Sequence, residues 1–141
     1  MTFFWLKATA FCHATEDQEK VERALYNLTG KKVTQIRNTT GHYKNPILIM
    51  ECSLKRKADV EAVFARLGSE TVRTILEELD LRMDNGILSL RFHKQQAFRG
   101  NAVLLRYGSD VVSIKGKARI YHGNEQDAFF HVKAFLESMA D

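Results

Sequence analysis

Three cations recur at every second position towards the C-terminal end of the chain: Lys115, Lys117 and Arg119. In a β-strand this spacing places all three on one face, about 6 to 7 Å apart, and Tyr121 continues the row. Such a row is suited to contacting successive phosphates of a nucleic-acid backbone. A solvated strand face also carries charge for solubility alone, but no acid relieves the mutual repulsion of these three cations, which favours binding.

Two other segments carry polar side chains that could contact RNA. The first follows a predicted strand and combines amides, which read base edges, with cations, which contact phosphates. The second is a loop in which an aromatic pair and a cation could stack on an unpaired base. Each segment is equally consistent with an ordinary connection between strands. The candidate residues are Arg91, Lys94, Gln95 and Arg99 in the first segment, and His42, Tyr43 and Lys44 in the second.

Aromatic residues on the first predicted strand leave two alternatives open. Phe4 and Leu6 are expected on one face of this strand, and Phe3, Trp5 and Phe11 on the opposite face. If that opposite face is open, Trp5 and Phe11 are platforms for base stacking or contacts to a second copy of the chain. If helices cover that face, Trp5 and Phe11 belong to the core.

An enzymatic site would have to be assembled from histidines and carboxylates that are scattered along the chain. Glu16 and Asp17, however, lie in the first turn of a predicted helix, where the helix dipole favours acids. No HExxH, GxSxG, P-loop or DxD arrangement is present. We therefore expect no catalytic activity and no cofactor. The residues available to such a site are His13, Glu16 and Asp17, with His42, His93 or His122.

Charge is sorted along the chain. Residues 1–14, 31–57 and 87–122 together carry +13, and the remaining segments together carry −9, which leaves the formal net charge of +4. The acidic segments have helical periodicity and the basic ones mostly alternate like strands, so helices layered on a sheet would separate the two signs. A basic sheet face of this kind suits phosphate.

Length and composition predict a single domain over residues 1–141, because 141 residues with 45% hydrophobic content can bury one core. No apolar run approaches the ~20 residues of a membrane span, so we expect a cytoplasmic protein with no membrane partner. Cys12 and Cys52 have no ligand spacing and are expected to be buried, reduced thiols without a metal.

Periodicity predicts an α+β fold of two layers, with a mostly antiparallel sheet and helices packed on one face. Asn85-Gly86 is the strongest hairpin signal. Thr15 is the expected cap of the first helix and Gly30 its end. Strands are expected over 3–13, 32–38, 48–54, 81–83, 88–92, 102–107 and 111–121, and helices from Thr15, over 60–67 and 72–79, and from Asn124.

Four stretches occur here in an order that resembles a family of small archaeal RNA-binding-domain proteins, often described as predicted exosome subunits. They are HATED (13–17), TGHYKNPI (40–47), LSLRFHKQQAFRG (88–100) and DVVSIKGKARIY (110–121). The resemblance implies a fold like that of the ribosomal protein that binds 5S ribosomal RNA. It also implies RNA as the partner, with exosome or ribosome-related proteins as further partners, and it supplies no catalytic residue.

The resulting hypothesis is a non-enzymatic RNA-binding protein, a monomer or homodimer, that acts as an accessory factor in RNA processing or degradation. Its basic sheet face and adjoining loops would contact phosphates and recognise shape or single-stranded features. The alternative is a protein-interaction module of a larger RNA-processing assembly. In that case the acidic helices or the surface around Trp5 and Phe11 would dock the partner.

Overall fold

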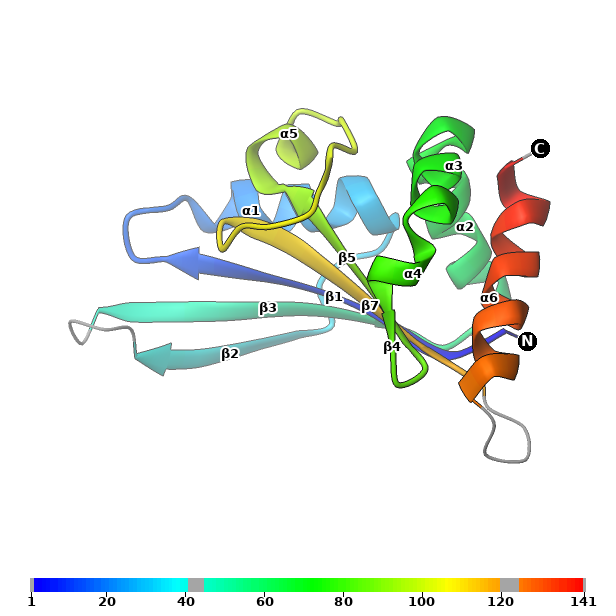
Figure 1. Ribbon diagram of the computed structural model, residues 1–141. Coiled ribbons are helices and arrows are strands. Elements are labelled where there is room, and N and C mark those ends of the chain that lie inside the picture. The colour runs from blue at the N-terminus through cyan, green and yellow to red at the C-terminus, as the bar shows by residue number, and fades with distance from the viewer. Residues whose placement is uncertain (1, 41–44, 120–124, 141) are drawn as a thin grey trace.

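Helices cover one face of a seven-stranded antiparallel sheet in the computed structural model, which describes residues 2–40, 45–119 and 125–140 (Figure 1). This arrangement confirms the predicted α+β fold. The strands are β1 (Phe3–His13), β2 (Gln35–Thr40), β3 (Pro46–Leu54), β4 (Met83–Asp84), β5 (Ile87–His93), β6 (Leu104–Leu105) and β7 (Val111–Ala118). The helices are α1 (Gln18–Thr29), α2 (Lys57–Leu67), α3 (Ser69–Glu77), α4 (Leu79–Arg82), α5 (Lys94–Phe98) and α6 (Glu125–Ala140).

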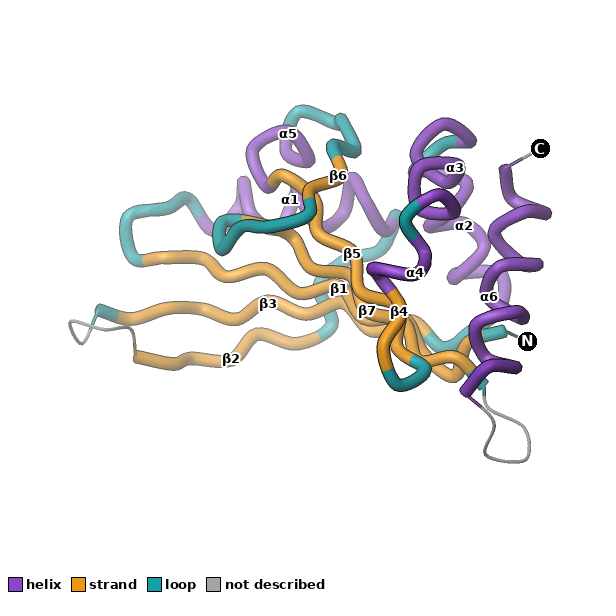
Figure 2. The backbone as a smooth tube through the Cα atoms, viewed as in Figure 1, coloured by secondary structure: helices purple, strands orange, loops and turns teal. Residues whose placement is uncertain are grey.

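The strands follow the order β2-β3-β1-β7-β5-β4, and β6 pairs with the outer side of β5. All pairings among the described strands are antiparallel, and the longest ladders join β1 to β3 and to β7. Figure 2 shows the strands as one twisted layer beneath the helices. The two long central strands, β1 and β7, therefore define which residues point towards the helices and which point away.

The beginning of β1 contains a bulge that corrects the predicted alternation. The register with β7 shifts between Phe3 and Trp5, because Phe3 pairs with Ala118 and Trp5 with Lys117. The extra residue places Phe3 in the core with Leu6, each at 1% exposure, and leaves Phe4 47% exposed, whereas simple alternation predicted that Phe4 would share a face with Leu6. Phe3 then packs on the rings of two helical residues, Phe64 and Phe135.

Two glycines mark helix ends as the sequence predicts. Gly30 ends α1 in the left-handed conformation at φ 75°, as predicted. The N-cap is Asp17 instead of Thr15, because the Asp17 carboxylate accepts a hydrogen bond from Glu19 N at 2.9 Å. Gly68 separates α2 from α3. Asn124, the predicted cap of the last helix, lies outside the described residues.

The predicted hairpin at Asn85-Gly86 is present, and both residues have positive φ, at 51° and 77°. Such a turn matches the twist of paired strands. The strand before it is shorter than expected, because residues 79–82 form α4, and within 102–107 only Leu104–Leu105 pair. The strand expected over 32–38 is shifted to Gln35–Thr40.

Gly116 is required by close packing inside β7. A Cβ at this position would lie 2.8 Å from Leu6 Cδ1 and 3.0 Å from the ring of Phe3. We expect Gly116→Ala to lower the free energy of unfolding by about 1 to 3 kcal/mol, since overpacking forces neighbouring side chains from their preferred rotamers. Urea denaturation measures this loss. Ser113→Ala, on the other face of the same strand, is the control and should change stability by less than ~0.5 kcal/mol.

The two cysteines are buried and reduced, as expected. Burial, followed by the nearby Glu16 carboxylate, raises the pKa of the Cys12 thiol, and burial also raises the pKa of Cys52. Both thiols therefore stay protonated and unreactive at neutral pH.

Among the residues described, no helix is both long enough and apolar enough to cross a membrane.

Candidate nucleic-acid interface

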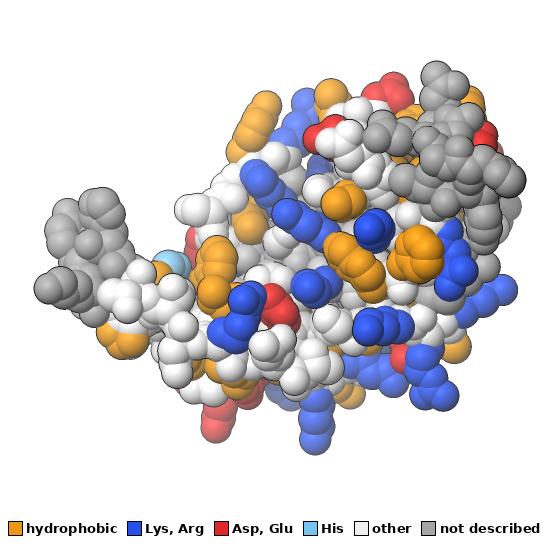
Figure 3. All heavy atoms as spheres, turned by 90° about the horizontal axis from the view of Figure 1, so that it is seen from below, with side chains coloured by type: hydrophobic (Ala, Val, Ile, Leu, Met, Phe, Trp, Pro, Cys, Tyr) orange, Lys and Arg blue, Asp and Glu red, His pale blue; other side chains and the backbone are white. Residues whose placement is uncertain are grey.

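The face of the sheet that points away from the helices, called the open face below, is rich in cations. Figure 3 looks directly onto it and shows Lys and Arg side chains gathered over its middle, with hydrophobic side chains between them. Residues that pair across neighbouring strands lie on the same face of the sheet, so the strand register shows which cations lie on the open face. They include Lys7 on β1, Lys115 and Lys117 on β7, and Arg91 on β5.

The cations lie on three neighbouring strands, and two of them are directly opposite each other. Lys7 pairs with Lys115, which also pairs with Ser89 on its other side. Lys117 lies two residues further along β7, and Arg91 lies one row away, opposite Ser113. Like charges on directly opposite positions are destabilising, by up to about 1 kcal/mol per pair. This arrangement therefore costs stability and is consistent with selection for an anionic partner.

These four cations lack compensating acids. Across β1, β7 and β5, the described open-face positions carry no carboxylate. Lys115, Lys117 and Arg91 form no ion pair with any residue that the structure describes. The Glu51 carboxylate on β3 is bound by Arg37 Nη2 at 2.6 Å. The positive charge of the open face is therefore available to a ligand.

A hollow of about 620 Å³ lies among these cations and holds the aromatic residues of β1. Trp5 is half-buried and Phe11 is 44% exposed, so both lie on an open face and not in a core covered by helices. Lys7 Nζ lies 5.4 Å from the centre of the Trp5 ring. Aromatic rings beside cations are the usual means of stacking bases while binding phosphates. The hollow is lined by Trp5, Lys7, Thr9, Phe11, His13, Ser89, Arg91, Gly108, Ser109, Val111, Ser113 and Lys115.

Arg119, the last cation of the predicted row, is placed differently from Lys115 and Lys117. It follows the end of β7, and its guanidinium lies 4.6 Å from the centre of the Phe4 ring. Its Nε is buried without a hydrogen-bond partner among the described residues. Arg119 therefore borders the open face and is already in contact with an aromatic ring.

The segment after β5 does not adjoin the open face, which corrects its predicted role. Residues Lys94–Phe98 form α5, which lies in the helical layer beside α1 (Figure 1). Asn27 Nδ2 of α1 donates to the carbonyls of Ala97 and Phe98 at 2.9 and 3.1 Å. Gln95 and Arg99 are exposed there, on the opposite side of the sheet from Lys115. Of this predicted group, only Arg91 faces the same way as the cations of β7.

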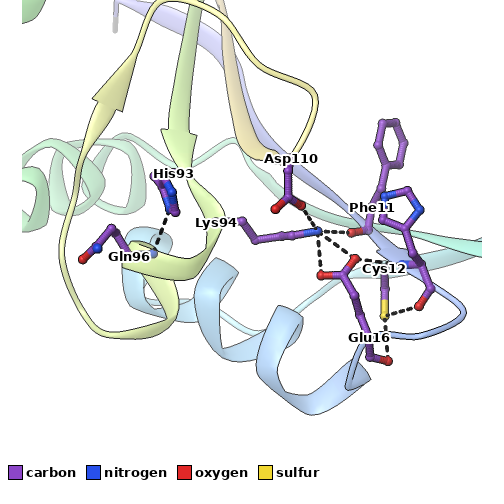
Figure 4. A network of polar contacts seen from close by, with 8 residues as sticks. Phe11, Cys12, Glu16, His93, Lys94, Gln96 and Asp110 are labelled. Carbon is purple, nitrogen blue, oxygen red and sulfur yellow. Dashed lines mark hydrogen bonds and ion pairs between the residues drawn. The ribbon is translucent and has the colours of Figure 1, made fainter.

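Lys94 is buried in a network of ion pairs, which does not fit its prediction as a phosphate contact. It is only 2% exposed, and its ammonium donates to the Phe11 carbonyl and to Glu16, each at 2.9 Å (Figure 4). Its third partner is Asp110 Oδ1, at 2.7 Å. All three ammonium hydrogens are therefore engaged.

The protonation of Lys94 follows from this environment. Burial lowers the pKa of its ammonium, but hydrogen bonds and charges from Asp110 and Glu16 outweigh burial, so the pKa is raised above its ordinary value of 10.5. Lys94 is charged at neutral pH, and its contacts connect α5 to β1 and to the residues just before α1 and β7.

The residues considered for catalysis are engaged in structure. Glu16 binds Lys94 and also accepts from His13 N, and Asp17 caps α1. His93 Nδ1 accepts a hydrogen bond from Gln96 N at the start of α5. Within the described ranges, no three His, Cys, Asp or Glu side chains gather as a metal site.

Four predicted site residues, His42, Tyr43, Lys44 and Tyr121, lie outside the described residues. Two open-face cations were missed by the sequence prediction. Lys7 alternates with Trp5 on β1, and that alternation is a signal that could have identified it. Arg37 lies on β2, whose weak alternation hides its direction.

Comparison with known proteins agrees with this geometry. A family model described as RNA binding matches residues 5–118, which contain all of the sheet except the first two residues of β1. The chain belongs to this RNA-binding family. The matched range contains Lys7, Arg91, Lys115 and Lys117 and the aromatic residues of the hollow.

Individual relatives are similar over almost their whole length. An RNA-binding protein of Pyrococcus abyssi is 27% identical, over 94% of this chain and 92% of its own. The solved structure of a DUF54 protein from Methanothermobacter thermautotrophicus has a TM-score of 0.83 at 28% identity, covering 96% of this chain and 99% of that one. A DUF54 family protein from Archaeoglobus fulgidus has a TM-score of 0.78 at 27% identity, covering 97% and 99%.

Proposed function

We propose that this chain is a cytoplasmic, non-enzymatic protein that binds RNA through the open face of its sheet. The observation that carries the proposal is a group of cations at the aromatic residues of the open face: Lys7, Arg91 and Lys115 line the hollow with Trp5 and Phe11, and Lys117 pairs with Trp5. Membership of the RNA-binding family supports RNA as the anionic ligand of this face. Cations without acidic partners bind the phosphates, and the exposed rings stack on unpaired bases.

Single-stranded segments fit this surface better than a duplex. A base must leave its helix to stack on a protein ring, and sequence-tolerant binding by stacking is typical of open sheet faces. In the cell, this activity suits an accessory factor in RNA processing or degradation, and exosome components are the proposed protein partners. The carboxylates that a catalytic site would need are used for capping and for binding Lys94.

Trp5 provides a direct test because it is the single tryptophan of the chain. We expect its fluorescence to be quenched by a single-stranded oligouridine, with the same midpoint as fluorescence anisotropy of the labelled RNA. Trp5→Ala should weaken binding about 10-fold, and Trp5→Phe should weaken it less, because one stacked base contributes about 1 to 3 kcal/mol. Binding seen by anisotropy with unchanged Trp5 emission would place the RNA elsewhere.

A second candidate function is a protein-interaction module. Phe130 on the acidic helix α6 is 59% exposed and offers an apolar contact to a partner protein. Salt separates the two functions, because phosphate contacts make the logarithm of affinity fall steeply with the logarithm of salt. Loss of a pulled-down protein partner on Phe130→Ser, with RNA affinity intact, would favour the second function.

A further inference from the structure

A second hollow of about 360 Å³ lies at the edge of the sheet, next to the open face. It shares Ser89 and Arg91 with the larger hollow, so the two meet on β5. Its volume falls within the range of roughly 300 to 1,000 Å³ that is usual for small-molecule sites. Its lining residues are Glu78, Leu81, Arg82, Ser89, Arg91, Arg106 and Tyr107.

The hollow exists because the outer side of β5 is paired discontinuously. β4 pairs with residues 87–88 and β6 with residues 91–92, which leaves Ser89 and Leu90 without a strand partner on that side. Arg82, at the end of α4, extends its side chain from this edge to β6. Its side chain is 7% exposed, and Nη1 donates to the Leu105 carbonyl at 3.3 Å.

Three arginines and one carboxylate line this hollow. Glu78 Oε2 lies 2.8 Å from Arg106 Nε and 3.4 Å from Arg82 Nη2. Arg106 remains 63% exposed, and Arg91 has no ion-pair partner among the described residues. The buried Nε of Arg82 also has no partner there. The lining therefore carries an excess of positive charge that suits a phosphate.

The apolar part of the lining is equally unusual. Tyr107 is 83% exposed and Leu81 is 73% exposed, the two highest values among the exposed large hydrophobic residues that the structure describes. Both line the same hollow as the three arginines. An exposed ring next to guanidinium groups is the combination that holds an unstacked base beside its phosphate.

We propose that this hollow binds one nucleotide of a single-stranded RNA that continues from the open face. The phosphate contacts Arg91 and Arg106, the base lies on Tyr107, and Leu81 closes the other side. The inference rests on the proposed function, because the RNA reaches the hollow past Arg91, which belongs to both sites.

The test uses a 10-nucleotide oligouridine, the whole chain and fluorescence anisotropy. We expect Tyr107→Ala and Arg106→Gln each to weaken binding about 5- to 10-fold. Matched controls on the helical layer are Tyr26→Ala, which removes another exposed tyrosine, and Arg23→Gln, and each should change affinity less than 2-fold. With 4-thiouridine in the oligonucleotide, irradiation should cross-link Tyr107, and Tyr107→Ala should abolish that adduct.

The outcomes separate this inference from the proposed function. If the wild-type protein does not bind the oligouridine, both fail together. If it binds and loses affinity on replacement of Lys115 and Lys117 with glutamine, but Tyr107→Ala and Arg106→Gln bind normally, the edge hollow is no RNA site. If uridine monophosphate alone binds as tightly as the 10-mer, the hollow is a free-nucleotide site and the inference is overturned.

Discussion

Replacing Lys7, Arg91, Lys115 and Lys117 together with glutamine is expected to weaken RNA binding about 100-fold at ~0.15 M salt. Each phosphate contact on a single strand contributes about 0.7 to the slope of log affinity against log salt, so four lost contacts lower the slope by roughly 3. A gel-shift salt titration measures both quantities. Stability should be unchanged or slightly higher, because the substitutions remove the repulsion between Lys7 and Lys115.

The control variant removes the same number of positive charges from the helical layer. Arg23, Lys57, Arg99 and Lys133 are exposed there, and their replacement with glutamine should alter affinity less than ~5-fold. If both quadruple variants weaken binding equally, only the overall charge matters and the open face is not the site. If neither does, RNA binding does not depend on these cations.

Lys94→Met is expected to have the largest effect on stability, a loss of about 2 to 3 kcal/mol in the free energy of unfolding. Removing one partner of a buried ion pair typically costs about 3 to 5 kcal/mol, and the cost is lower here because Asp110 is 60% exposed and can be rehydrated. Chemical denaturation measures the loss. Lys133→Met, an exposed lysine of α6, should stay within ~0.5 kcal/mol of the wild type.

The pH dependence follows from the raised pKa of Lys94. The folded protein holds this proton more tightly than the unfolded chain does, so the contribution is fully present at neutral pH. It declines as the pH rises above 10.5 and through the higher pKa of the folded state. The stability difference between wild type and Lys94→Met should therefore shrink in that alkaline range, and a constant difference would contradict the ion-pair explanation.

The same variant checks that Lys94 does not contact RNA. The salt slope of the folded Lys94→Met protein should equal that of the wild type, whereas loss of a phosphate contact would lower it by about 0.7. A lowered slope would show that the ammonium leaves Glu16 and Asp110 to bind RNA.

The layers of this fold could be predicted from local patterns. Strands β1 and β7 are long and alternate clearly, and alternation fixes which side chains share a face. Lys115, Lys117 and Arg91 were placed on one side of the sheet for this reason. The bulge after Phe3 could not be predicted, because both faces of β1 begin with phenylalanine and hydrophobicity does not distinguish the two registers.

The surroundings of Lys94 were beyond prediction for a different reason. A lysine among glutamines resembles a solvated loop residue, and nothing nearby in sequence supplies its partners. Glu16 and Phe11 are 78 and 83 positions away along the chain. The edge hollow was missed because Leu81, Arg91 and Tyr107 meet only where β4 and β6 leave a gap along β5.

The separation of charge between the layers has a consequence for how the protein meets its ligand. Acids equal or outnumber cations in α1, α2, α3 and α6, while the described open-face positions of β1, β5 and β7 carry four cations and no carboxylate, so the molecule has an electric dipole across its thickness. In the field of a polyanion, such a molecule rotates so that its open face points towards the polyanion before contact, and it is repelled when its helices point that way. Productive encounters are enriched, although the net charge is only +4. Added salt should therefore slow association far more than it hastens dissociation.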